Sequence, residues 1–184
     1  MSMRELITVS RDVDAILIPA GTPVTLPKGS EVYITQALGG NYTVNANGNL
    51  VQIAAQNADA IGFDTPPPLQ PKPGSENSND VDEDLLWLQL RTCYDPEIPV
   101  NMVDLGLIYS CTVKKLEDGG NRVDILMTLT APGCGMGDFL ASDVKQKVMM
   151  VPNVTDVNVE LTFDPPWNHE MMSDAAKLQT GMYY

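Results

Sequence analysis

The stretch VDILMTLTAPGCGMGDFLASDVKQKVM, residues 123–149, joins a strand pattern to a helix pattern through a turn of Pro and Gly residues. Its first part predicts a strand with one apolar face, made by Val123, Ile125, Met127 and Leu129. Its last part predicts a helix over about 137–150 with a stripe of Leu140, Val144 and Val148, and Lys145 and Lys147 in its C-terminal half, where the helix dipole favours cations. Cys134 lies in the turn between the two patterns and belongs to neither.

The patterns on either side of this stretch extend it to a small α+β domain over residues 81–184. Asp80 and Glu83 predict the capped start of a helix that ends before DPEIP. A strand over about 105–115 and a turn at DGG precede the central strand. A last strand alternates polar residues with Val157, Val159, Leu161 and Phe163, which predicts one core face. The order is α-β-β-α-β-α with a three-stranded mixed sheet, whose last two strands should be parallel because a helix connects them.

The N-terminal part differs in character from this domain. Residues 1–63 contain short runs rich in Val, Ile, Thr and Tyr that are separated by turn pairs, which predicts a small all-β module, a barrel or β-roll of about five strands. Residues 64–80, DTPPPLQPKPGSENSND, are rich in Pro and then polar, and they predict a semi-extended linker. We therefore expect a docking or stability module, a linker and the α+β domain.

Composition excludes several classes of function. A formal net charge of −13 disfavours nucleic acid as a partner, because an acidic surface repels phosphates. No apolar run approaches the length of a membrane span and the first residues do not resemble a secretory signal, so we expect a cytoplasmic protein without a membrane partner. Three cysteines without a close pair argue against disulfides, and one histidine gives little support to a zinc site.

The three thiols differ in their expected roles. Cys93 and Cys111 fall on apolar faces of a helix and a strand, where cysteine behaves as a small hydrophobic residue. Cys134 precedes a helix N-terminus, where unpaired N–H groups and the helix dipole stabilise a thiolate. Because a thiolate is both a nucleophile and a metal ligand, this argument predicts a reactive or ligating Cys134 without deciding between the two.

Two further groups are weaker candidates. Asp95 and Glu97 of DPEIP form a second polar group, although their spacing alone favours a helix stop with solvated carboxylates. The segment PPWNHE, with Trp167 and His169, could be a lid or a docking site, and a lone histidine is seldom a catalytic base.

Three segments together resemble a known family of iron–sulfur assembly factors. They are YDPEIPVNMVDLGLIY at 94–109, MTLTAPGCGMGDFLASDVKQKV at 127–148 and VPNVTDVNVELTFDPPWNHEMMSDAAK at 151–177. The domain resembles bacterial SufT-type factors, a subunit of the eukaryotic cytosolic iron–sulfur targeting complex, and the PaaD component of phenylacetate degradation. The resemblance covers about residues 81–179, and the part before it looks like the extension of longer SufT forms.

The resemblance implies an accessory factor, not an enzyme, that carries or targets clusters or iron to apo-proteins. The family's signature residues fall on Asp95, Pro96 and Glu97 of the DPE motif and on Thr130, Pro132, Gly133 and Cys134 of the TxPGC motif. It implies Cys134 as the metal ligand, with Asp95, Glu97 and Thr130 at the cofactor-binding site. The implied partners are iron–sulfur assembly machinery and apo-clients.

The number of cysteines limits how a cluster could be held. A cluster needs about four ligands of the thiolate kind, and the chain offers one strong candidate. We therefore expect a transient iron–sulfur cluster or iron and no tightly bound cofactor, with two copies in a homodimer or a partner completing the site. Two alternatives stay open: a thiol enzyme with Cys134 as nucleophile in acyl or persulfide transfer, and an adaptor in which Cys134 is only a turn residue.

Overall fold

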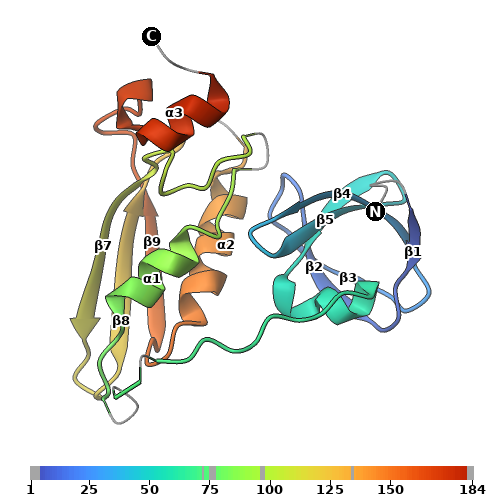
Figure 1. The fold of residues 1–184 in the computed structure, drawn as a ribbon, viewed down its shortest axis with the longest axis horizontal. Helices are drawn as coiled ribbons and strands as arrows, with labels where there is room; N and C mark the ends of the chain where they lie inside the picture. Colours follow the sequence, from blue (N-terminus) through green and yellow to red (C-terminus); the bar gives the residue numbers. More distant parts are fainter. Residues whose placement is uncertain (1–4, 72, 75–77, 96–97, 134, 182–184) are drawn as a thin grey trace. The chain divides into compact units, whose positions relative to one another are not determined.

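The chain forms two compact units, each with its own sheet, at residues 1–67 and 68–184 (Figure 1). The computed structural model describes residues 5–71, 73–74, 78–95, 98–133 and 135–181. The α+β class with an all-β N-terminal part is confirmed.

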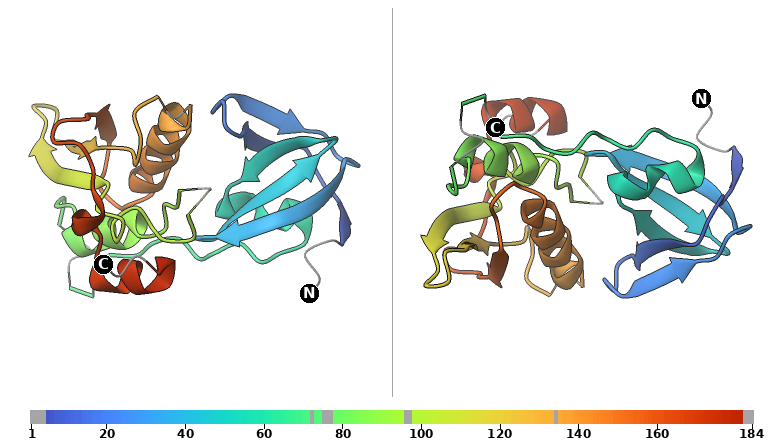
Figure 2. Two further views of the ribbon diagram at one scale, coloured as in Figure 1. Left: turned by 90° about the horizontal axis from the view of Figure 1, so that it is seen from above. Right: turned by 90° about the horizontal axis from the view of Figure 1, so that it is seen from below.

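The first unit is a single antiparallel sheet of six strands in the order β1-β4-β5-β6-β2-β3. Its elements are β1 (Leu6–Thr8), β2 (Val13–Leu17), β3 (Pro23–Leu26), β4 (Glu31–Leu38), β5 (Asn41–Ala46), β6 (Asn49–Ile53) and the 3-10 helix η1 (Ala55–Ile61). The strands curl round, and η1, in teal, packs on β2 and β5 (Figure 2). The sequence predicted about five strands, and the additional strand is β1, a three-residue edge strand paired with β4.

The core of the first unit explains why these short strands hold together. Alternate residues of neighbouring strands point to one side, where a cluster of buried residues includes Val13, Val32, Val44, Val51 and Ile53. The opposite side is more exposed along the strands, as the alternation in β4 shows. This pattern of buried and exposed residues is typical of an antiparallel sheet with one solvated face.

The second unit places helices on a three-stranded sheet of order β7-β8-β9. Its elements are α1 (Glu83–Leu90), β7 (Ile108–Lys115), β8 (Asn121–Met127), α2 (Gly137–Met149), β9 (Asp156–Leu161), the 3-10 helix η2 (His169–Met171) and α3 (Asp174–Thr180). β7 is antiparallel to β8 and β9 is parallel to β8, so the sheet is mixed, as predicted. α2 packs against β9, and α1 packs against α2.

The apolar faces predicted for the second unit are largely buried. The predicted stripes of α1, β8 and α2 are at most 5% exposed: Leu86, Leu90, Cys93, Val123, Ile125, Met127, Leu129, Leu140, Val144 and Val148. The prediction for β9 is wrong at its C-terminal end. Leu161 is 37% exposed and Phe163, just beyond the strand, is 42% exposed, because β9 is an outer strand of the sheet.

The helix predicted to start at Asp80 is instead capped two residues later. The Asp82 side chain accepts hydrogen bonds from the backbone N–H groups of Asp84 and Leu85, at 3.0 and 3.4 Å. Asp80 is engaged elsewhere, because its carboxylate pairs with the Lys115 ammonium. Both positions carry an aspartate, so the sequence pattern alone did not separate them.

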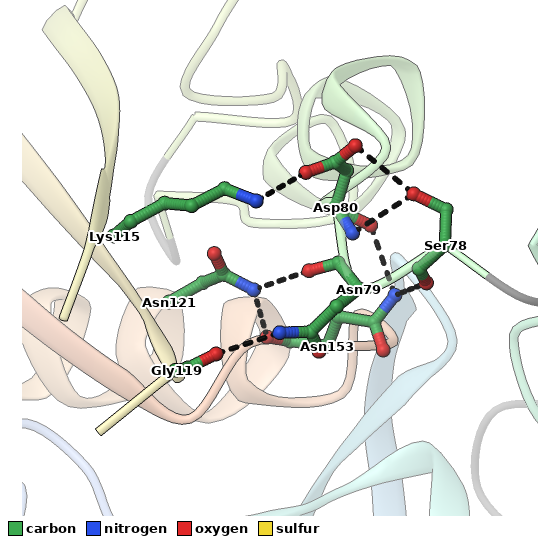
Figure 3. A network of polar contacts seen from close by, with 7 residues as sticks. All are labelled: Ser78, Asn79, Asp80, Lys115, Gly119, Asn121 and Asn153. Carbon is green, nitrogen blue, oxygen red and sulfur yellow. Dashed lines mark hydrogen bonds and ion pairs between the residues drawn. The ribbon is translucent and has the colours of Figure 1, made fainter. Parts of the chain in front are cut away.

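A polar network ties residues 78–80 to the end of the sheet where the β7–β8 turn lies (Figure 3). The Asn121 amide donates to the carbonyls of Asn79 and Asn153, and the Asn153 amide donates to the carbonyls of Ser78 and Asp80. Because Asn121 is fully buried, its side chain needs these partners. The end of the predicted linker is therefore fixed to the β7–β8 turn and the α2–β9 loop.

Candidate functional site

The topology of the second unit brings the signature segments to one end of the sheet. β8 and β9 are parallel and end there, and β7 is antiparallel and begins there. Three segments therefore meet at this end, which we call the loop end: residues 98–107 before β7, residues 128–133 and 135–136 after β8, and residues 162–173 after β9. The network of Figure 3 lies at the opposite end, around the β7–β8 turn.

The turn between β8 and α2 is open to solvent. Thr130 is half-buried, and the next three residues, through Gly133, are exposed. Gly133 has a φ of 77°, in the left-handed region where glycine is favoured. A Cβ on Gly135 would meet no atom within 4 Å, so the turn leaves room there. Cys134, between these two glycines, lies outside the described residues.

The start of α2 has the features of an anion-stabilising helix end. Its N-cap residue is Met136, whose side chain accepts no hydrogen bond from the first turn. The N–H groups of the first helical turn and the helix dipole point toward the turn, and the N-cap side chain supplies no capping oxygen. Asp138, predicted as a first-turn charge, lies in the first turn of α2 and is exposed.

The described residues on either side of Pro96 and Glu97 are held together after α1. Tyr94 pairs with Asn101 in an isolated bridge, and the N–H of Ile98 donates to the carbonyl of Asp95 at 3.3 Å. Asp95 is only 7% exposed, which contradicts the interpretation of this residue as a solvated carboxylate at a helix stop. Glu97, the second predicted carboxylate, lies outside the described residues together with Pro96.

Hydrogen bonds to backbone carbonyls join the three segments of the loop end. The N–H of Thr128 donates to the carbonyl of Leu107 at 2.8 Å, which links the segment after β8 to the segment before β7. The indole N–H of Trp167 donates to the carbonyl of Leu105 at 2.7 Å, and the hydroxyl of Tyr109 donates to the carbonyl of Pro165 at 2.6 Å. PPWNHE is therefore attached to the segment that follows the DPE motif.

Gly106 allows the closest of these approaches. A Cβ at this position would lie 2.3 Å from the carbonyl oxygen of Met171 and 2.8 Å from its carbonyl carbon. Its φ of 77° is also in the left-handed region. Only glycine satisfies both conditions without moving the backbone.

The two described cysteines have little thiolate character. Cys93, predicted on the apolar face of the helix, lies three residues after α1 ends but is completely buried. Burial raises the pKa of its thiol far above the usual range, with a further contribution from the Asp143 carboxylate. Burial raises the pKa of Cys111, which is half-buried on the outer strand β7, to about 11. Both observations agree with a packing role.

The described residues contain no group of three or more His, Cys, Asp or Glu side chains that could hold a metal ion. His169 is exposed at the loop end, and its ring centroid lies 5.4 Å from that of Trp167 in a tilted arrangement. Of the four predicted site residues, the structure describes Asp95 and Thr130, and it does not describe Glu97 or Cys134.

No described helix is long and apolar enough to cross a membrane.

One charged residue near the DPE motif was not predicted to be buried. Lys147 was expected only as a cation near the end of α2, but it is 6% exposed and its ammonium donates to the carbonyl of Thr92. The same ammonium lies 3.6 Å from the Asp143 carboxylate, one helical turn away. The i, i+4 spacing of Asp143 and Lys147 was visible in the sequence and indicates this ion pair. The Lys147 hydrogen bond therefore fixes the backbone at Thr92, three residues before Asp95.

Comparison with known proteins gives a consistent picture for the second unit. Residues 86–161 match a protein family described as iron–sulfur cluster assembly protein. A relative in Porphyromonas gingivalis, an Fe-S protein maturation auxiliary factor, is 51% identical over 101 residues, which are 55% of this chain and 91% of the relative. The Staphylococcus aureus auxiliary factor SufT is 39% identical over 48% of this chain and 96% of its own length.

A more distant relative has a related name and a much longer chain. The iron–sulfur cluster carrier protein of Synechocystis is 29% identical over 83 residues, which are 45% of this chain and 22% of the relative. The matched family region lies entirely within the second unit.

Proposed function

The chain belongs to the family of iron–sulfur cluster assembly proteins, and we propose that it is an auxiliary factor in the maturation of iron–sulfur proteins. It carries a cluster or iron, or brings the assembly machinery, to apo-proteins. The relatives that support this function are named as auxiliary factors or carriers. We propose no catalytic role.

The observation that carries the proposal is the setting of the TxPGC turn. The turn is exposed on both sides of Cys134, and it leads within three residues into the uncapped start of α2. A thiolate there gains from the helix dipole and from unpaired N–H groups, while exposure permits exchange with another protein. This supports Cys134 as the ligand that holds the cargo.

The other predicted site residues have supporting roles in this proposal. Thr130 begins the same turn and is half-buried, so that it anchors the turn beside the end of β8. Asp95 is buried after α1, and the segment 98–107 that follows contacts the segment after β8, because Leu107 accepts a backbone hydrogen bond from Thr128. We propose that Asp95 and Glu97 shape the site, and that Cys134 alone among the four supplies a strong ligand.

The cluster is cargo in this account and is held for a short time. The chain contains three cysteines, and the two described ones have raised pKa values because of burial. Since a cluster needs about four ligands, a second copy of the chain or a partner protein completes the set. Incomplete ligation by one chain favours release to a client, and the partners are assembly machinery and apo iron–sulfur proteins.

The test is anaerobic loading with iron and sulfide, followed by transfer. The natural chain, Cys134→Ser and the control Cys111→Ser are loaded, examined by absorption and Mössbauer spectroscopy, and mixed with apo-aconitase. We expect the natural chain and the control to bind a cluster and activate aconitase, and Cys134→Ser to do neither. Absence of a protein-bound cluster in the natural chain, alone or with a partner, would contradict the carrier role.

A further inference from the structure

The apolar side of β9 becomes steadily less covered toward the end of the strand. Val157 is 2% exposed and Val159 is half-buried, but Leu161 is 37% exposed and Phe163, two residues further, is 42% exposed. Leu161 still points to the helix side, because its Cδ1 atom lies 3.1 Å from the position that a Cβ on Gly137 would take. The alternation of a core strand therefore continues where the described residues provide no complete cover.

The missing cover lies on the outer edge of the sheet. In the order β7-β8-β9, β9 has β8 on one side and no strand on the other among the described residues. An outer strand presents backbone N–H and C=O groups along its free edge, which are a template for another strand. A fourth strand would pair with these groups and pack its own apolar side chains beside Val159, Leu161 and Phe163.

The polar side of the same strand indicates the charge of the added strand. Asp156 and Glu160 are exposed there, on either side of Asn158. Two cations of this sheet face, Lys114 and Arg122, both pair with Asp124, at 2.7 and 3.0 Å. Within the described part of the chain, no ion pair reaches Asp156 or Glu160, so these carboxylates can attract cations of a partner.

The opposite edge of the sheet, at β7, does not combine an exposed apolar side with an acidic polar side. β7 carries Lys114 and Lys115 at its exposed end, and charged lysines are typical of edges protected against pairing. Its apolar side chains, among them Tyr109 and Val113, are half-buried. An exposed apolar side and an acidic polar side occur together only at β9 among the described edges of this sheet.

We propose that the β9 edge binds an extended segment of a partner protein in which apolar residues alternate with Lys or Arg, and that this segment adds a fourth strand. Backbone hydrogen bonds provide the pairing, apolar side chains cover Leu161 and Phe163, and cations face Asp156 and Glu160. The identification of the partner as a client or assembly protein rests on the proposed function, whereas the edge and its charge do not.

The binding test uses the full chain and a defined probe. The probe is a dye-labelled, end-blocked peptide of about eight residues with alternating Val and Lys, the length of an ordinary strand. Fluorescence anisotropy measures its affinity, and amide hydrogen exchange locates the contact. We expect binding that weakens with salt, and slower exchange in β9 but not in β7 when the peptide is present.

Two variants and one modified peptide separate the contributions. Glu160→Lys should weaken binding by about fivefold to tenfold, because an attraction is replaced by a repulsion of similar size. Leu161→Thr keeps a strand-forming residue and should also weaken binding, because apolar cover is lost. The control Glu117→Lys makes the same charge change at the β7–β8 turn and should have little effect. N-methylation of alternate peptide amides should abolish binding, because it blocks the strand-to-strand hydrogen bonds.

Several results would overturn the proposal. They are no binding by the natural chain, equal binding of the N-methylated peptide, and equal weakening by Glu117→Lys and Glu160→Lys. Sedimentation showing a dimer that Leu161→Thr dissociates would assign the edge to a second copy instead. Because the binding test contains no iron and the aconitase test contains no peptide, either proposal can fail without the other.

Discussion

Replacing Gly106 with alanine tests how the loop end is held together. The added Cβ would lie 2.3 Å from the carbonyl oxygen of Met171, which belongs to the backbone and cannot rotate away. The left-handed backbone at φ 77° costs a non-glycine residue about 1–2 kcal/mol, and relieving the contact costs about 1–3 kcal/mol more. We therefore expect Gly106→Ala to lower the free energy of unfolding of the second unit by about 2–5 kcal/mol.

Urea unfolding followed by tryptophan fluorescence measures this loss. Both tryptophans, Trp87 and Trp167, belong to the second unit, so the signal reports on that unit alone. A shift of the midpoint on the order of 1–2 M urea is expected. The matched control is Gly119→Ala, where φ is 85° but a Cβ would meet nothing within 4 Å, so only about 1–2 kcal/mol should be lost. Equal losses in the two variants would refute the reasoning from the Met171 contact.

Three further predictions concern ionisable groups. At pH 8, carbamidomethylation of Cys111, whose pKa is raised to about 11, should be on the order of 100-fold slower than that of Cys134 by peptide mass spectrometry, and equal rates would contradict the assigned roles. Lys147→Met should lower the free energy of unfolding by about 3 kcal/mol in urea, because it removes a buried cation from its carboxylate partner; an unchanged midpoint would show that the pair adds nothing. The Lys115 hydrogen bond lowers the pKa of Asp80, so this aspartate stabilises the fold above its unfolded pKa of about 4, and the contribution is lost as pH falls through the lower folded pKa. The difference in free energy of unfolding between the natural chain and Asp80→Asn should therefore shrink below about pH 4. A difference that persists at about pH 2 would contradict the assignment.

The sequence contained enough information to predict the architecture of the second unit. Alternation at Val123, Ile125 and Met127 and the helical stripe from Leu140 to Val148 correspond to β8 and α2. The parallel pairing of β8 and β9 followed from the helical connection between them. These features are local or depend on one connection, so they can be inferred without tertiary contacts.

Contacts between distant segments were beyond the sequence pattern. Nothing local shows that Gly106 lies against Met171, which is more than sixty residues away, or that Lys147 reaches the carbonyl of Thr92. Leu161 was predicted to be buried because alternation reports which side a residue faces and not whether a neighbouring strand covers it. The same discrepancy led to the proposed binding edge.

The candidate site was predicted only in part. The turn around Cys134 was identified from its glycines and from the helix pattern that follows, and its exposed flanks and the uncapped α2 agree with that interpretation. The burial of Asp95 was not predicted, because a DPE sequence after a helix is equally compatible with an exposed turn. The role of Cys134 as a ligand stays a prediction.

Complementation tests the central claim, that Cys134 serves iron–sulfur protein maturation, most directly. Cells that lack the gene for this chain receive the natural chain, Cys134→Ala or the control Cys111→Ala at matched expression, and aconitase activity is measured under high demand for iron–sulfur clusters. We predict that the natural chain and the control restore the activity and that Cys134→Ala does not. Equal restoration by all three would contradict the account and would support an adaptor in which Cys134 is only a residue of the turn.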